Sequence, residues 1–97
     1  MGKLTWTHES EKWLRDIFDY IQDENPDAAR SVVTGIFEKA QVLEKFPEAG
    51  YRYEASDRNV RILLYGHYRI AYLVRENQDV DILGVFHGAL DIRRYAL

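Results

Sequence analysis

The chain has 97 residues, 46% of them hydrophobic, and a formal net charge of −3. This length supports one hydrophobic core, so a single domain over residues 1–97 is expected. The sequence contains no cysteine, which excludes disulfides, thiol catalysis and cysteine-based metal sites and suits a reducing cytoplasm. Acidic and basic residues interrupt the N-terminal region early, so neither secretion nor membrane insertion is expected.

Charge is distributed unevenly along the chain. Residues 1–50 carry six Lys or Arg against ten Asp or Glu, a difference of −4, whereas residues 51–97 carry seven Arg against six acids, a difference of +1. Non-specific nucleic-acid binders need a large positive charge, so any nucleic-acid role here requires a local site. Arginine forms planar, bidentate contacts with anions and stacks on rings, which predicts an anionic partner for the second half. The alternative is that these arginines serve in strand pairs and internal ion pairs.

The first half of the chain predicts one short strand and two helices. Alternation over residues 3–7 indicates a strand, and Thr7 is a suitable N-cap for an amphipathic helix over residues 8–24. Asn25, followed by proline, favours the start of a second helix, whose hydrophobic period continues to about Lys45. Because the link between the helices is short, we expect an antiparallel helical hairpin.

After Gly50 the hydrophobic period changes from helical to alternating. Residues 60–65, 68–75 and 80–86 are predicted strands joined by short turns. Short turns require antiparallel pairing. The element order is therefore β-αα-βββ, an α+β domain of two layers in which an antiparallel sheet packs against the helical hairpin.

Three side chains of the predicted sheet are candidates for a functional site. An arginine inside a strand, such as Arg69, needs an anionic partner or a route to solvent, so an internal ion pair and a ligand contact are both open. Histidine is a side chain suited to acid–base chemistry, which makes His87 a candidate, although a lone histidine at a strand end is more often structural. Whether Arg61 shares a face with these two depends on strand register, which the sequence does not define. The histidines lack metal-ligand spacing, and no cofactor is expected.

Six short motifs follow one another along nearly the whole chain. They are Trp13-x3-Ile17-x2-Tyr20-Ile21, Asn25-Pro26-x-Ala28-Ala29, Phe46-Pro47-x2-Gly50, Val60-Arg61, Tyr68-Arg69-Ile70-x-Tyr72 and Ile82-Leu83-x-Val85-x-His87-Gly88. Together they resemble the motifs of the RelE/ParE superfamily of bacterial type II toxins. The resemblance implies the RelE/ParE-like toxin fold and a cytoplasmic stress-response toxin that forms a hetero-oligomer with a cognate antitoxin. The disordered segment of such an antitoxin folds across the toxin on binding.

Two activities occur in the superfamily, and the residues present favour the ParE-like branch, which inhibits DNA gyrase through a protein–protein contact. Many RelE-like nucleases use lysines after the second helix and an arginine near the end of the last strand. Here no lysine follows Lys45, and Gly88 lies close to the position of that arginine. One alternative is a metal-independent, ribosome-dependent mRNA endoribonuclease, with Arg61, Arg69, His87 and Tyr95 as catalytic candidates. The other is a non-toxic relative that only binds an antitoxin.

The residues expected to contact the target or the antitoxin are arginines, tyrosines and one histidine of the second half. They are Arg52, Arg61, Tyr68, Arg69, His87, Arg93, Arg94 and Tyr95. Arginine and tyrosine are enriched at protein interfaces, so this composition suits contact with gyrase or, in the alternative, with the ribosome and mRNA.

Overall fold

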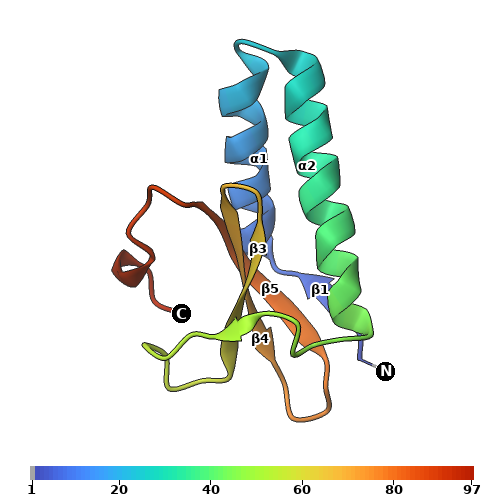
Figure 1. Cartoon of the computed structure of the whole chain (residues 1–97), viewed down its shortest axis with the longest axis vertical. Helices are drawn as coiled ribbons and strands as arrows, with labels where there is room; N and C mark the ends of the chain where they lie inside the picture. The colour runs from blue at the N-terminus through green and yellow to red at the C-terminus, as the bar shows by residue number, and fades with distance from the viewer. Residues whose placement is uncertain (1) are drawn as a thin grey trace.

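The computed structural model describes residues 2–97. Its elements are, in chain order, β1 (Leu4–Trp6), α1 (His8–Gln22), α2 (Pro26–Ala40), η1 (Gln41–Glu44), β2 (Tyr51–Arg52), β3 (Val60–Tyr65), β4 (Tyr68–Val74), β5 (Val80–His87) and η2 (Ile92–Arg94). Figure 1 shows α1 and α2 side by side as an antiparallel hairpin, with the strands below and the C-terminal segment turning back beside the sheet. The predicted α+β order is confirmed. No helix of residues 2–97 is long and apolar enough to cross a membrane.

Both helices begin where their capping residues predict. The Thr7 hydroxyl accepts the Ser10 backbone N–H at 3.1 Å, and the Asn25 side-chain oxygen accepts the Ala28 N–H at 3.0 Å. The helices are shorter than predicted, because α1 ends at Gln22 and α2 ends at Ala40. Beyond α2 the chain tightens into the 3₁₀ turn η1, a common way for a helix to end.

The sheet has the order β1-β5-β4-β3-β2, and β3, β4 and β5 form the predicted antiparallel meander. It is mixed rather than wholly antiparallel, because β1 pairs with β5 in parallel. These two strands are far apart in sequence, so no tight turn constrains their direction. The two-residue strand β2, which the sequence did not predict, pairs antiparallel with β3.

Strand register assigns the two faces of the sheet. Ile70 and Tyr72 of β4 lie opposite Val85 and Ile82 of β5, and these four side chains pack with the helices in the larger core cluster. Between these pairs the register shifts, so that Leu83 is an extra residue in a β-bulge. The other face has a smaller cluster of Ile62, Ala71, Phe86 and Ile92. Because Ile92 belongs to η2, the C-terminal segment covers this second face.

Candidate functional site

The tip of the β3–β4 hairpin meets the end of β5. Tyr68 pairs with His87, and Arg69 pairs with Phe86. Adjacent strand residues point to opposite faces, so Tyr68 and His87 lie on the helix side and Arg69 on the other. The Tyr68 and His87 rings are edge to face with centroids 5.5 Å apart, and the His67 ring stacks on His87 at 6.2 Å.

Arg69 connects β4 to the segment that follows β5. One guanidinium nitrogen donates to the carbonyl oxygens of His87, at 3.2 Å, and Leu90, at 2.6 Å. Within residues 2–97 no carboxylate lies in salt-bridge range of Arg69, although Asp91 is near enough for Arg69 to contribute to lowering its pKa, after Arg93 as the main cause. Arg69 therefore joins β4 to the segment after β5 through backbone carbonyls rather than through the internal ion pair that the sequence left open.

Arg61 is a residue of β3, and its side chain contacts a different part of the molecule, the loop between η1 and β2. Its guanidinium donates to the carbonyl of Gly50 at 2.6 Å and lies 3.9 Å from the Glu48 carboxylate. In register, Arg61 lies between Arg52 and Tyr72 on the helix side of the sheet. Arg52 is exposed.

The structure does not bring together the three residues that a nuclease site would need. Arg69 lies opposite Leu64, three residues beyond Arg61 on β3, which is about 10 Å along the strand. The two arginines also point to opposite faces, and His87 is on the helix side at the far end of β5. The shared face considered for Arg61, Arg69 and His87 is therefore absent.

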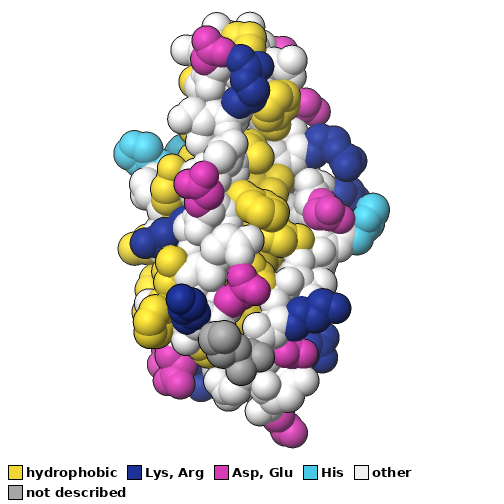
Figure 2. Space-filling view, turned by 90° about the vertical axis from the view of Figure 1, so that its right-hand side faces the viewer, with side chains coloured by type: hydrophobic (Ala, Val, Ile, Leu, Met, Phe, Trp, Pro, Cys, Tyr) yellow, Lys and Arg dark blue, Asp and Glu magenta, His cyan; other side chains and the backbone are white. Residues whose placement is uncertain are grey.

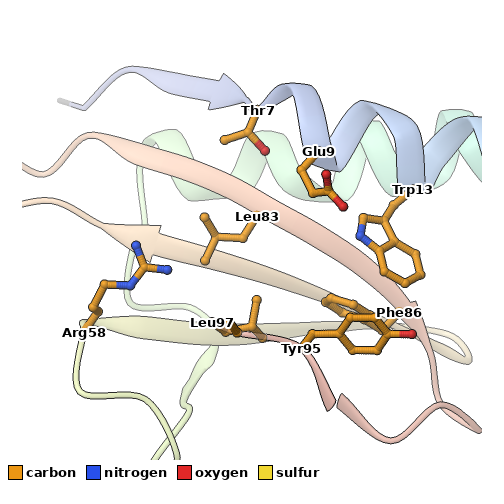
Figure 3. Close-up of a pocket in the computed structure, with 9 residues that line it drawn as sticks. Thr7, Glu9, Trp13, Arg58, Leu83, Phe86, Tyr95 and Leu97 are labelled. Atoms are coloured by element: carbon orange, nitrogen blue, oxygen red, sulfur yellow. The ribbon is translucent and has the colours of Figure 1, made fainter. Parts of the chain in front are cut away.

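Tyr95 lies in an aromatic cluster with Trp13 and Phe86. Its ring centroid is 5.2 Å from Trp13 and 5.0 Å from Phe86, while Trp13 and Phe86 are 4.5 Å apart. These rings form one end of a cavity of about 420 Å³, with Arg58 at the other end (Figure 3). β1 pairs only with the start of β5, at Val80–Ile82. Beyond that point, Trp13 of α1 contacts Phe86 of β5 and Tyr95 of the C-terminal segment.

Arginine and tyrosine side chains gather on this side of the molecule. Tyr53, Arg58, Arg93 and Tyr95 line a second cavity of about 470 Å³, and Arg94 is exposed in the same segment. We call these five residues the arginine–tyrosine surface. The Arg93 Nε lies 3.0 Å from the Asp91 carboxylate, whose pKa it lowers by hydrogen bonding.

Two residues of this surface, Tyr53 and Arg58, were not predicted as site residues. Both lie in the aperiodic stretch between β2 and β3, and only folding of the C-terminal segment places them beside Arg93 and Tyr95. The available sequence signal was the excess of arginine and tyrosine after Gly50.

A groove runs between α1 and the end of β5. Its cavity of about 440 Å³ is lined mainly by apolar and aromatic side chains, namely Trp13, Ile17, Tyr20, Tyr68, Val85 and Leu90. Asp16 and His87 add polar groups to the lining. Tyr20 is 83% exposed, and burial, with a smaller contribution from Tyr20, raises the pKa of Tyr68. The predicted residues Tyr68 and His87 therefore belong to this groove, separate from Arg93, Arg94 and Tyr95.

Comparisons with known proteins agree with this architecture. The family model for the ParE toxin of the type II toxin–antitoxin system parDE matches residues 4–92. The toxin-like protein Y4kP of Sinorhizobium fredii is 32% identical over 86 residues, which is 89% of this chain and 88% of that protein.

Two similar solved structures share the fold. The chromosomal ParDE toxin–antitoxin system from P. aeruginosa contains a chain with a TM-score of 0.77 at 22% identity, covering 90% of this chain and 96% of that one. The RelBE2 toxin–antitoxin complex from Mycobacterium tuberculosis contains one with a TM-score of 0.64 at 21% identity, covering 89% and 96%. The extent of the family match and the identity to Y4kP show that this chain belongs to the ParE toxin family of type II toxin–antitoxin systems, within the RelE/ParE superfamily.

Proposed function

We propose that this toxin inhibits DNA gyrase through a protein–protein contact and is neutralised in the cytoplasm by a cognate antitoxin. One observation carries the choice of target. Of the nuclease candidates, Arg69 and His87 line one cavity, but Arg61 and Tyr95 lie elsewhere, and both strand arginines bind backbone carbonyls of their own chain. RNA cleavage needs a proton acceptor, a proton donor and phosphate support around one bond. Inhibition by contact needs none of these.

The arginine–tyrosine surface is the proposed gyrase contact. Arginine and tyrosine give large contact areas and directional hydrogen bonds, and both are enriched among interface residues that dominate binding energy. Arg58 and Arg94 are exposed and have no ion-pair partner within residues 2–97. Their guanidinium groups can therefore bind carboxylates of a protein partner without first breaking an internal contact.

The groove between α1 and β5 is the proposed antitoxin site. Its lining is apolar and aromatic, with Tyr20 standing largely free of contacts at one side. An amphipathic segment that folds on binding buries such a surface by inserting apolar side chains at helical spacing. The known structures of similar fold come from toxin–antitoxin systems, which supports a hetero-oligomer of toxin and antitoxin here.

One observation favours a second candidate, the ribosome-dependent mRNA endoribonuclease. Arg52 of β2 lies directly opposite Arg61 of β3. Like charges in this position repel, and a bound phosphate would relieve the repulsion. Glu48 lies near enough to Arg61 to offset part of that charge, which weakens the case for RNA.

Controlled expression in bacteria separates the two activities. Gyrase inhibition predicts induction of the SOS response and filamentous cells, whereas A-site cleavage predicts immediate arrest of translation and cut mRNA. Cells that stop translating first, with no SOS signal, would overturn the proposed target. Normal growth at high expression of the folded chain would favour the non-toxic alternative.

A further inference from the structure

We propose that two copies of this chain pair through β1, so that their sheets become continuous across a two-fold axis. The proposal concerns the open edge of β1, whose residues Leu4 and Trp6 line neither the groove nor the cavity of the arginine–tyrosine surface. A result that excludes the dimer therefore does not exclude gyrase as the target, and the reverse also holds.

The backbone of β1 has an open edge. β1 is the first strand in the sheet order and pairs only with β5. The Val80 N–H donates to the Lys3 carbonyl at 2.8 Å, and the Thr7 N–H donates to the Ile82 carbonyl at 3.3 Å. In a parallel ladder these bonds alternate along the strand, so Leu4 and Trp6 direct their N–H and C=O groups away from β5. Unpaired groups of this kind are a template for another strand.

A second copy fits this edge by symmetry. If β1 of a second copy runs antiparallel and centres on Thr5, Leu4 of one chain lies opposite Trp6 of the other. Each of the two equivalent Leu4–Trp6 pairs then exchanges both backbone hydrogen bonds. A contact of this type uses the same patch on both subunits and closes on itself as a dimer.

Apolar side chains continue the contact beyond the strand. Trp6 stacks on Phe37 of α2, with ring centroids 5.4 Å apart and planes 8° from parallel, and Phe37 is nevertheless 46% exposed. Val42 of the neighbouring η1 is also exposed. Figure 2 views this side of the molecule and shows hydrophobic side chains along its middle with charged ones on both flanks.

Charge favours an antiparallel second copy as the occupant. Lys3 precedes β1, while Glu9 and Glu11 lie in the first turn of α1, just after it. Antiparallel pairing brings Lys3 of each chain toward the Glu9 and Glu11 end of the other, twice by symmetry. Parallel pairing would instead place like charges together, which is unfavourable.

The dimer leaves the other surfaces free. β1 covers only Val80–Ile82, the start of β5, whereas the groove is lined by Val85 and His87 at its other end. A dimeric toxin can therefore carry two antitoxin segments and present two arginine–tyrosine surfaces.

Sedimentation velocity of the purified chain, over roughly 1 to 200 μM, tests the proposal. Pairing of three-residue strands with a small apolar patch predicts a weak interface and a dissociation constant on the order of micromolar. Phe37→Glu is expected to weaken the dimer about tenfold or more, since it places a desolvated charge in the contact. Tyr20→Glu, an exposed aromatic in the groove, is the matched control and leaves the dimer unchanged.

Amide exchange by NMR locates the interface. The Leu4 and Trp6 amides are expected to exchange more slowly as concentration rises, with no such change at Leu64 on the opposite edge. A monomer at every concentration, or a dimer with no added protection at Leu4 and Trp6, would overturn the proposal. If Phe37→Glu fails to fold, Lys3→Glu should weaken the dimer, and combining it with Glu9→Lys and Glu11→Lys should restore it. If the combined variant does not regain the dimer, the proposed pairing through β1 is wrong.

Discussion

The hydroxyl of Tyr72 accepts the backbone N–H of Gly50 at 2.9 Å, although the two residues are 22 positions apart. The same hydroxyl donates to the Pro47 carbonyl at 2.7 Å, and Arg61 donates to the Gly50 carbonyl. A Cβ at Gly50 would lie 2.5 Å from the Ile62 carbonyl oxygen, so the loop approaches the sheet as closely as glycine allows. One buried phenol thus fixes the chain where it passes from helices to sheet.

Tyr72→Phe is expected to destabilise the fold by about 2 kcal/mol, because it leaves the Gly50 N–H and the Pro47 carbonyl without their partner. Urea unfolding followed by circular dichroism measures this change. Tyr20→Phe is the control, since the Tyr20 side chain is mostly in solvent. Equal stability of both variants and the parent would show that the loop is held by other contacts.

The free energy of unfolding should decrease in alkaline solution because the buried Tyr72 hydroxyl resists ionisation in the folded state. Burial is the main reason that the pKa of Tyr72 is raised above its ordinary value of 10.0. Its contribution is therefore fully present below pH 10 and is lost as pH rises through the higher folded pKa. Unfolding free energies measured from pH 8 to 11 should fall more steeply for the parent than for Tyr72→Phe. Parallel curves would contradict this assignment.

Arg69→Ala is expected to loosen residues 88–97, because Arg69 binds the carbonyls of His87 and Leu90. From the sequence alone, Arg69 was expected among the residues that contact the target or the antitoxin. The structure instead predicts a destabilisation of about 1 to 3 kcal/mol and faster amide exchange in the C-terminal segment. If Arg69→Ala leaves amide exchange in residues 88–97 unchanged but abolishes target binding, Arg69 is a contact residue rather than a structural one.

Removing exposed groups from the two proposed surfaces should separate their functions. Arg93→Ala with Arg94→Ala should weaken gyrase inhibition at least about tenfold and leave antitoxin binding intact. Arg30→Ala is the matched control, because Arg30 is an exposed arginine on α2 that pairs with Asp27. Inhibition unaffected by the double change would exclude this surface as the gyrase contact.

Tyr20→Ala should have the opposite pattern. An aromatic anchor of a groove commonly contributes about 2 kcal/mol, so antitoxin affinity should fall roughly thirtyfold while gyrase inhibition persists. Phe46→Ala, which changes an exposed aromatic outside the groove, should leave affinity unchanged. Calorimetry with the co-encoded antitoxin measures the affinity of both variants. An equal loss of affinity in Tyr20→Ala and Phe46→Ala would exclude the groove as the antitoxin site.

Local sequence signals predicted the helices and the three-strand meander, because caps at Thr7 and Asn25 and short-range periodicity determine them. Features that depend on distant residues could not be predicted. The parallel pairing of β1 with β5 and the bulge at Leu83 are of this kind. The separation of Arg61 from Arg69 is another such feature, because it depends on strand register and on which face of the sheet each side chain occupies.

A supercoiling assay with purified DNA gyrase tests the central claim most directly. Added toxin should inhibit supercoiling and trap cleaved DNA, and prior addition of the antitoxin should prevent both effects. A toxin that kills cells but leaves gyrase fully active would contradict the proposal. Ribosomal mRNA cleavage, with Arg52 and Arg61 as the first residues to change, would then become the better account.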